Sequence, residues 1–152
     1  MIGLLQRVSR AHVETAGERI AGIGTGLLVL VGVERDDQSA DAERLLERVL
    51  GYRVFPDAAG RMNLSLTQIG GGLLLVPQFT LAADTRKGMR PSFSPAATPG
   101  HGSELYAALV DRARALHTPV ESGRFGADMQ VSLVNDGPVT IRLSTRARGP
   151  GD

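Results

Sequence analysis

Residue types that could do chemistry are concentrated in one loop, residues 77–93. The loop follows a continuously apolar segment and shows neither helical nor strand periodicity. Its cations, three within five residues, are Arg86, Lys87 and Arg90. Two interpretations stay open on chemistry alone. The loop is either a solvated connection that Phe79 and Phe93 anchor to the core, or a segment that holds a phosphate-bearing substrate with its cations facing the anion.

A second unusual segment is Asn-Asp-Gly-Pro at residues 135–138. Asp-Gly is a strong signal for a hairpin turn, and Pro138 would begin the next strand where no backbone N–H is needed. The alternative is a cis peptide bond between Gly137 and Pro138. Only about 5–6% of X–Pro bonds in folded proteins are cis, so the sequence alone does not support this alternative.

Conventional catalytic and cofactor motifs are missing from the chain. The glycine-rich segment 22–26 precedes an apolar strand, whereas dinucleotide-binding glycines follow one, and it lacks the P-loop lysine. His12, His101 and His117 have no partner at metal-ligand spacing. There is no cysteine, which excludes disulfides and thiolate chemistry. A conventional catalytic constellation is therefore missing.

The composition is that of one soluble domain. The chain has 152 residues, of which 42% are hydrophobic and 22% charged. Its longest apolar run, residues 27–33, is too short to cross a membrane, and Gln6, Arg7 and Arg10 interrupt any apolar signal segment. The net charge of +1 does not by itself indicate a nucleic-acid binder. The lack of cysteine suits a cytoplasmic location.

Periodicity predicts the elements that must position these residues. Apolar residues recur at helical spacing over residues 42–50, with Ser39 as N-cap and Gly51 as stop signal, and again over residues 105–116 behind a break at 98–100. Apolar runs or strict alternation predict six strands, at residues 4–13, 19–23, 27–31, 73–76, 129–133 and 139–143.

This order of elements predicts the fold class. The last two predicted strands would be joined by a hairpin at residues 135–138. Helices separated by strands, with all-strand ends, indicate a mixed α/β domain whose mixed sheet carries both helices on one side. Residues 146–152 are expected to be a disordered tail.

Several long motifs in a fixed order carry a resemblance to a known family over residues 4–143. They are Leu-Leu-Gln-Arg-Val at 4–8, Gly-Leu-Leu-Val-Leu-Val-Gly-Val at 26–33, Met-Asn-Leu-Ser at 62–65, the whole of 78–93, Gly-Arg-Phe at 123–125 and the run 127–140. In these segments the chain resembles the D-aminoacyl-tRNA deacylases, also called D-tyrosyl-tRNA deacylases.

The resemblance implies an activity and an architecture. The family consists of cytoplasmic homodimers that hydrolyse the ester joining a D-amino acid to the terminal ribose of tRNA, without metal or cofactor and away from membranes. Achiral glycine is accepted as well. The implied fold is one β-barrel-like mixed sheet with two helices packed on one side, here over residues 1–145, followed by the tail at 146–152.

The resemblance also assigns the residues that select the substrate. Gly137-Pro138 is expected to be cis and to reach into the pocket of the partner subunit. A rigid carbonyl there would accept a hydrogen bond from the substrate α-amino group and would collide with an L side chain. Met129 is expected to line the pocket. The tRNA-binding cations would be Arg86, Lys87 and Arg90.

The resemblance places Gln78, Phe79 and Thr80 at the scissile ester. In one mechanism Thr80 is the nucleophile. In the other, the ribose 2′-hydroxyl of the tRNA transfers the proton while the protein supplies position and backbone N–H groups. A threonine without a base is a weak nucleophile, and an aminoacyl ester is already activated, so we favour the RNA-assisted mechanism.

One departure from the family pattern concerns the residue before Gln78. The family usually has serine there, whereas this chain has Pro77, which removes both a hydroxyl and a backbone N–H. Two alternatives therefore stay open: a non-catalytic module that binds the acceptor end of tRNA, and an esterase that depends on Thr80.

Overall fold

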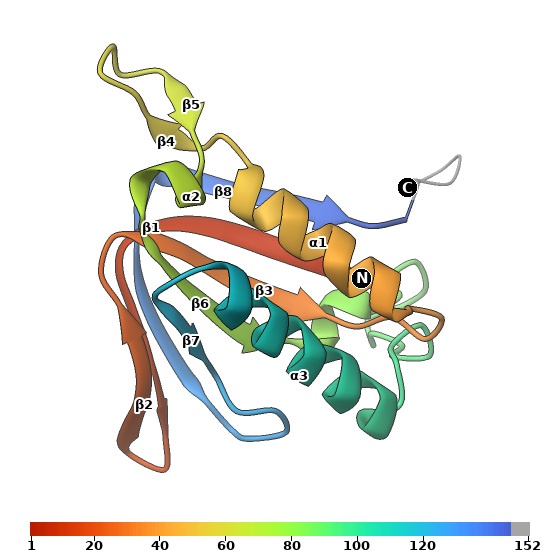
Figure 1. Ribbon diagram of the computed structural model, residues 1–152. Helices are drawn as coiled ribbons and strands as arrows, with labels where there is room; N and C mark the ends of the chain where they lie inside the picture. Colours follow the sequence, from red (N-terminus) through yellow and green to blue (C-terminus); the bar gives the residue numbers. More distant parts are fainter. Residues whose placement is uncertain (147–152) are drawn as a thin grey trace.

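A computed structural model describes residues 1–146, which form a twisted sheet with helices packed against it (Figure 1). The strands are β1 (Ile2–Thr15), β2 (Glu18–Ile23), β3 (Gly26–Gly32), β4 (Phe55–Pro56), β5 (Met62–Leu64), β6 (Gly72–Pro77), β7 (Val120–Ser122) and β8 (Gln130–Ser144). The helices are α1 (Ser39–Gly51), α2 (Leu66–Ile69) and α3 (Pro99–Leu116), with a 3₁₀ turn, η1 (Phe79–Ala82).

The long strand β1 organises a mixed, barrel-like sheet. Its first half pairs antiparallel with β3, its second half pairs with β2, and β8 runs along its other edge. β3 continues the sheet through parallel pairing with β6, and β6 pairs in parallel with β7. Figure 1 shows α1 and α3 lying over the same face of this sheet. The predicted fold class is confirmed.

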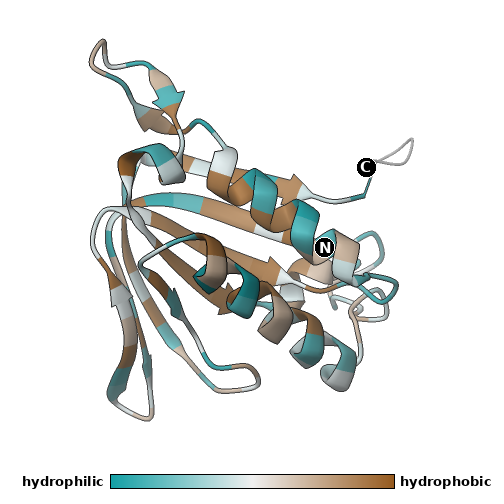
Figure 2. Cartoon of the chain, in the orientation of Figure 1, coloured by the Kyte–Doolittle hydropathy of each residue, from teal (hydrophilic) through white to brown (hydrophobic). Residues whose placement is uncertain are grey.

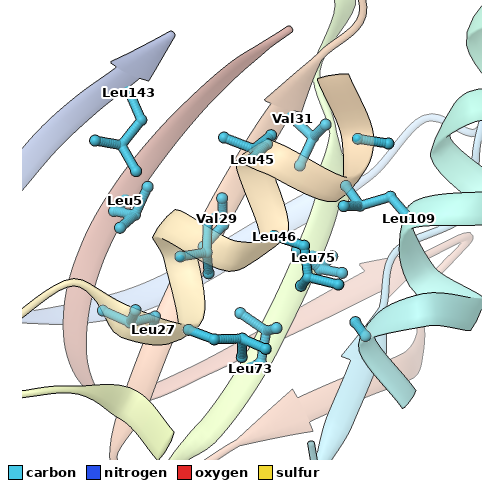
Figure 3. Packing of buried hydrophobic residues seen from close by; sticks show 14 of the residues in the cluster. Leu5, Leu27, Val29, Val31, Leu45, Leu46, Leu73, Leu75, Leu109 and Leu143 are labelled. Atoms are coloured by element: carbon cyan, nitrogen blue, oxygen red, sulfur yellow. The ribbon is translucent and has the colours of Figure 1, made fainter. Parts of the chain in front are cut away.

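Two hydrophobic cores lie on opposite faces of the central strands. Successive residues of a strand point to opposite faces, so a strand that is covered on both sides is continuously apolar. Leu73 and Leu75 of β6 pack with Leu46 and Leu109 under the helices (Figure 3). Leu74, with Leu28, Val8, Val13 and Val76, packs inside the curled sheet. Figure 2 shows the matching hydropathy, with brown strands and helices that carry teal residues on their outer sides.

Both predicted helices are present, but α1 has a different N-cap from the one expected. The N-cap is Gln38, not Ser39. The Gln38 N–H donates to Asp41 Oδ2 at 2.8 Å, and this hydrogen bond lowers the pKa of the Asp41 carboxyl. In α3 the predicted break is itself the helix start, because Thr98 is the N-cap and Pro99 occupies the first turn, where proline is tolerated.

The predicted hairpin at residues 135–138 is wrong, because both halves belong to the single strand β8. The register with β1 moves from Gln6 opposite Thr140 to Val8 opposite Asn135. β8 therefore uses five residue steps where β1 uses two, and the three extra residues form a bulge. Pro138 does not begin a second strand but lies in this bulge, where no ladder hydrogen bond is needed. The expected cis Gly137–Pro138 bond is confirmed.

The chain start is tied to the end of β8 by buried charges. The Met1 ammonium lies 2.7 Å from Asp37 Oδ1 and 3.0 Å from Glu34 Oε2, and it donates to Thr145 Oγ1 at 2.8 Å. Met1 and Asp37 are both fully buried. Arg146, expected in a disordered tail, lies 3.5 Å from Glu34 and Asp37 carboxylate oxygens. The rest of that predicted tail lies outside the described residues.

No helix within residues 1–146 is both long and apolar enough to cross a membrane.

We expect Asp37→Asn to lower the free energy of unfolding by about 3 kcal/mol, because it removes the fully buried partner of the Met1 ammonium and leaves that buried charge with the Glu34 carboxylate alone. Urea denaturation measures the change. Asp36→Asn is the matched control, since the Asp36 side chain is 79% exposed. A loss from Asp37→Asn no larger than that of the control would contradict a stabilising role for the Met1–Asp37 pair.

Candidate active site

The turn η1 carries two of the three residues predicted at the scissile bond, Phe79 and Thr80, and the third, Gln78, is its N-cap. It follows β6 directly, and the Gln78 N–H donates to the Val31 carbonyl at 2.7 Å, which ties the turn to the end of β3. Gly32 permits the close approach, because a Cβ at that position would lie 2.9 Å from the Leu81 Cβ. The turn is thus held by main-chain contacts at the carboxyl ends of two parallel strands.

Within η1, the Thr80 hydroxyl has an amide partner. Gln78 Nε2 donates a hydrogen bond to Thr80 Oγ1. An amide N–H cannot remove a proton from the hydroxyl, so this contact does not activate Thr80 as a nucleophile. In the described part of the chain, no histidine, lysine or carboxylate is hydrogen-bonded to Thr80. The first N–H groups of a helical turn have no partner within it, so η1 can offer backbone donors.

Phe79 and Met129 face a pocket of about 340 Å³ beside η1. One side of the pocket is formed by residues 76–79 and the other by the loop 125–129 and Val131. The Phe79 side chain is 57% exposed and meets Phe93 edge to face, with ring centroids 5.1 Å apart. The structure therefore brings Gln78, Phe79 and Met129 together around one cavity, whereas Thr80 does not line it.

Gly137 and Pro138 do not line this pocket in the same chain. They lie exposed in the β8 bulge. The side chains of Asn135 and Arg7 form hydrogen bonds with the backbone of this bulge. Asn135 Oδ1 accepts from the Val139 N–H at 2.7 Å, which closes the bulge. Arg7 Nε donates to the Asp136 carbonyl at 2.7 Å, and Arg7 Nη1 donates to the Val54 carbonyl at 2.7 Å.

Arg7 is a site residue that the sequence interpretation missed. Its side chain is only 13% exposed, and it links the bulge to the segment after α1. The sequence does contain a sign of this role, because Arg7 lies between the core residues Leu5 and Val8. A charged side chain in such a place needs polar partners. The identity of those partners depends on β8, which is distant in sequence.

The loop of residues 84–92, here called the cationic loop, has an ion pair at its start. Arg86 donates to both carboxylate oxygens of Asp84, at 2.9 and 2.8 Å, and these bonds hold the pKa of the Asp84 carboxyl well below its usual range. Asp84 and Ser92 also exchange two backbone hydrogen bonds across the base of the loop. Lys87 and Arg90 lie with them around an open hollow of about 570 Å³. Such an arrangement can receive an anion.

Tyr106 of α3 contacts Phe125, which lines the pocket. Its hydroxyl donates to the Leu75 carbonyl at 2.8 Å and lies 2.7 Å from Ser122 Oγ, and its ring lies 6.2 Å from that of Phe125. Burial raises the pKa of Tyr106 to about 12. Sequence periodicity placed Tyr106 in the core without indicating this polar role.

No three His, Asp or Glu side chains in residues 1–146 are grouped so that they could hold a metal ion.

Comparison with known proteins gives full-length matches. The model of the D-Tyr-tRNA(Tyr) deacylase family matches residues 4–144. A D-aminoacyl-tRNA deacylase of Alkalilimnicola ehrlichii is 64% identical over 146 residues, covering 96% of this chain and 97% of the relative. One from Thioalkalivibrio sulfidiphilus is 66% identical over 143 residues, covering 94% and 96%.

Two solved structures share the fold over nearly their whole length. The "c-Myc DNA Unwinding Element Binding Protein" matches with a TM-score of 0.93 and 37% identity, covering 97% of this chain and 100% of that chain. A "probable eukaryotic D-amino acid tRNA deacylase" matches with a TM-score of 0.82 and 17% identity, covering 93% and 97%. At that identity the second match shows the fold alone.

We expect Tyr106 to make stability fall as pH rises from about 10 to about 12, because the unfolded chain releases the phenolic proton near pH 10 and the folded chain holds it to about pH 12. The free energy of unfolding, measured by urea denaturation at several alkaline pH values, tests this. In Tyr106→Phe the decline should be shallower than in the unmodified chain. Equal slopes for the two proteins would contradict the burial of this hydroxyl.

Proposed function

Because this chain belongs to the D-Tyr-tRNA(Tyr) deacylase family, we propose that it hydrolyses the ester bond between a D-amino acid and the terminal ribose of tRNA. The observation that carries this proposal is the full-length match together with a pocket framed by Gln78, Phe79 and Met129. The products are the free D-amino acid and tRNA, and glycyl-tRNA is a further substrate. The reaction takes place in the cytoplasm, where its substrate is made.

Chiral selection is proposed to come from Gly137-Pro138 of a partner subunit in a homodimer. The bulge is exposed, stands apart from the pocket of its own chain, and is braced by Arg7 and Asn135. A braced carbonyl can accept a hydrogen bond from the substrate α-amino group while excluding an L side chain by collision. Glycine has no side chain to collide, so the same geometry accepts it. Two-fold symmetry gives two equivalent pockets, each completed by the other subunit.

For the chemical step, we propose that the ribose 2′-hydroxyl of the substrate takes part and that the protein positions the ester. Support comes from the Thr80 hydroxyl, whose partner is the Gln78 amide and not a base. Backbone N–H groups at the start of η1 are suited to stabilise the developing oxyanion. Pro77 offers neither a hydroxyl nor an N–H, so no hydrogen bond donated from that position enters this mechanism.

The cationic loop is proposed to hold the phosphates of the tRNA acceptor end. Its three cations are proposed to have different roles. Arg86 braces the loop through Asp84, while the exposed Lys87 and Arg90 face the phosphate backbone. Phosphate contacts of this kind fix the register of an RNA without reading its sequence, which suits an enzyme acting on many tRNAs.

A binding module without catalysis is the second candidate. It is favoured by the absence of a side-chain base at Thr80 and by the 37% identical structure, which is named for binding a DNA element. A third possibility is an esterase of small molecules that depends on the Thr80 hydroxyl. The two experiments below separate these functions.

We expect D-tyrosyl-tRNA to be hydrolysed at least about 100-fold faster than L-tyrosyl-tRNA, because the L side chain would collide with the backbone wedge. Release of labelled tyrosine from each substrate measures the rates. Glycyl-tRNA should be hydrolysed as well. Equal hydrolysis of both enantiomers would contradict the wedge, and tight tRNA binding without turnover would establish the binding module instead.

We expect Thr80→Ala to keep at least about one tenth of the wild-type kcat/KM, because the hydroxyl is not activated by a base. A substrate that ends in 2′-deoxyadenosine should react at least about 100-fold more slowly, since it lacks the proton-transferring hydroxyl. Loss of all activity in Thr80→Ala, with normal turnover of the deoxy substrate, would establish a threonine-dependent esterase.

A further inference from the structure

One polar pair, the buried Tyr106 and the half-buried Ser122, takes no direct part in the reaction proposed above. Tyr106 lies in the middle of α3 and is 4% exposed. A buried hydroxyl must be hydrogen-bonded or it costs stability, and a phenylalanine would fill the same space without that requirement. The role of the Tyr106 hydroxyl therefore follows from where its two oxygen partners, the Leu75 carbonyl and Ser122 Oγ, lie.

Those partners lie where the chain leaves β7. The Tyr106 hydroxyl donates to the Leu75 carbonyl at 2.8 Å and lies 2.7 Å from Ser122 Oγ, which lies 2.6 Å from the Gly123 carbonyl. The Gly123 N–H also donates to the Leu75 carbonyl, at 2.8 Å. The two hydroxyl protons can make two of these three oxygen–oxygen contacts at a time, and with the Gly123 N–H they fix the direction in which the backbone departs from Ser122.

The segment that departs there is the outer wall of the pocket. Residues 125–129 line the cavity opposite Gln78 and Phe79. Gly123 lies so close to the rest of the wall that a Cβ on it would be 3.0 Å from Met129 Sδ and 3.3 Å from Pro77 Cδ. A small shift at Gly123 therefore moves the wall relative to η1.

At its far end this wall continues directly into β8, whose Gln130 pairs with Glu14 of β1, and within it the Ala127 N–H donates to the Arg124 carbonyl at 3.2 Å. The near end is held less extensively. β7 pairs with β6 through three residues only and is half-buried. The far end of the wall is held by the Thr15 hydroxyl, which donates to the Asp128 carbonyl at 3.0 Å. The near end has the Tyr106–Ser122 pair and the Gly123 N–H.

We propose that Tyr106 and Ser122 are positioning residues that set the width of the aminoacyl pocket by fixing the point at which the chain leaves β7. The pair does not touch the reacting ester, and it acts through Met129 and Phe125. The effect on catalysis rests on the proposed function, whereas the effect on the pocket wall does not.

The kinetic test is Tyr106→Phe, which removes the hydroxyl and keeps the ring. We expect KM for D-tyrosyl-tRNA to rise about fivefold with kcat within about twofold, as for a loss of binding shared by ground state and transition state. Tyr52→Phe is the matched control, because the Tyr52 hydroxyl makes no hydrogen bond among the described residues and lies by the outer groove of α1. It should match the wild type.

A structural readout keeps the inference testable if the chain proves not to be a deacylase. With methyl-¹³C methionine, the chain has four labelled methyl groups, one of them on Met129. Tyr106→Phe should shift the Met129 methyl resonance, whereas Tyr52→Phe should not. An unshifted Met129 resonance would overturn the proposal even if activity changed, and a shifted resonance without deacylation by the wild type would leave it standing while the proposed function failed.

Variants of Ser122 complete the test. Ser122→Ala should reproduce the rise in KM, and combining it with Tyr106→Phe should add little, because both remove one network. Ser122→Thr keeps the hydroxyl and should restore the wild-type KM. Additive effects of the two single changes, or a fall in kcat at unchanged KM, would overturn the positioning role.

Discussion

The site depends on how β8 pairs with β1. Both strands keep their antiparallel ladder on either side of a bulge, although β8 takes five steps from Asn135 to Thr140 where β1 takes two from Gln6 to Val8. The three extra residues cannot enter the ladder and stand out from the sheet. Hydrogen bonds from Arg7 and to Asn135 fix them there. The result is an exposed backbone segment with a defined position, which is what selection by shape requires.

The same two strands are fixed at their other ends by charge. The ammonium of Met1, where β1 begins, meets Asp37 before α1 and Thr145 after β8. Because this cluster is buried, its electrostatic interactions are little screened by solvent. This cluster connects the segment before α1 to the start of β1 and the end of β8. Ion pairs therefore hold the two strands together at this end, whereas backbone hydrogen bonds pair them along their length.

The pocket is shaped by close packing of main chain, whereas the cationic loop is shaped by hydrogen bonds and an ion pair. Gly32 lets η1 lie directly against β3, and Gly123 lets the opposite wall approach Pro77. The cationic loop is closed by two backbone hydrogen bonds between Asp84 and Ser92, and Arg86 pairs with Asp84 within it, so Lys87 and Arg90 are presented from a closed loop. The two features thus differ in kind, with close main-chain packing around the cavity and exposed cations around a separate hollow.

Sequence alone determined the elements whose signals are local. Helical period predicted α1 and α3, and continuous apolar runs predicted β3 and β6. Gln78, Phe79 and Met129, singled out from sequence motifs, lie on the two sides of one cavity. Tertiary structure decided the rest. Asn-Asp-Gly-Pro has the local hydrogen-bonding pattern of either a turn or a bulge, and only the length of β1 makes it a bulge. For the same reason Arg7 could not be assigned, since its partners in β8 are distant in sequence and are brought to it only by pairing.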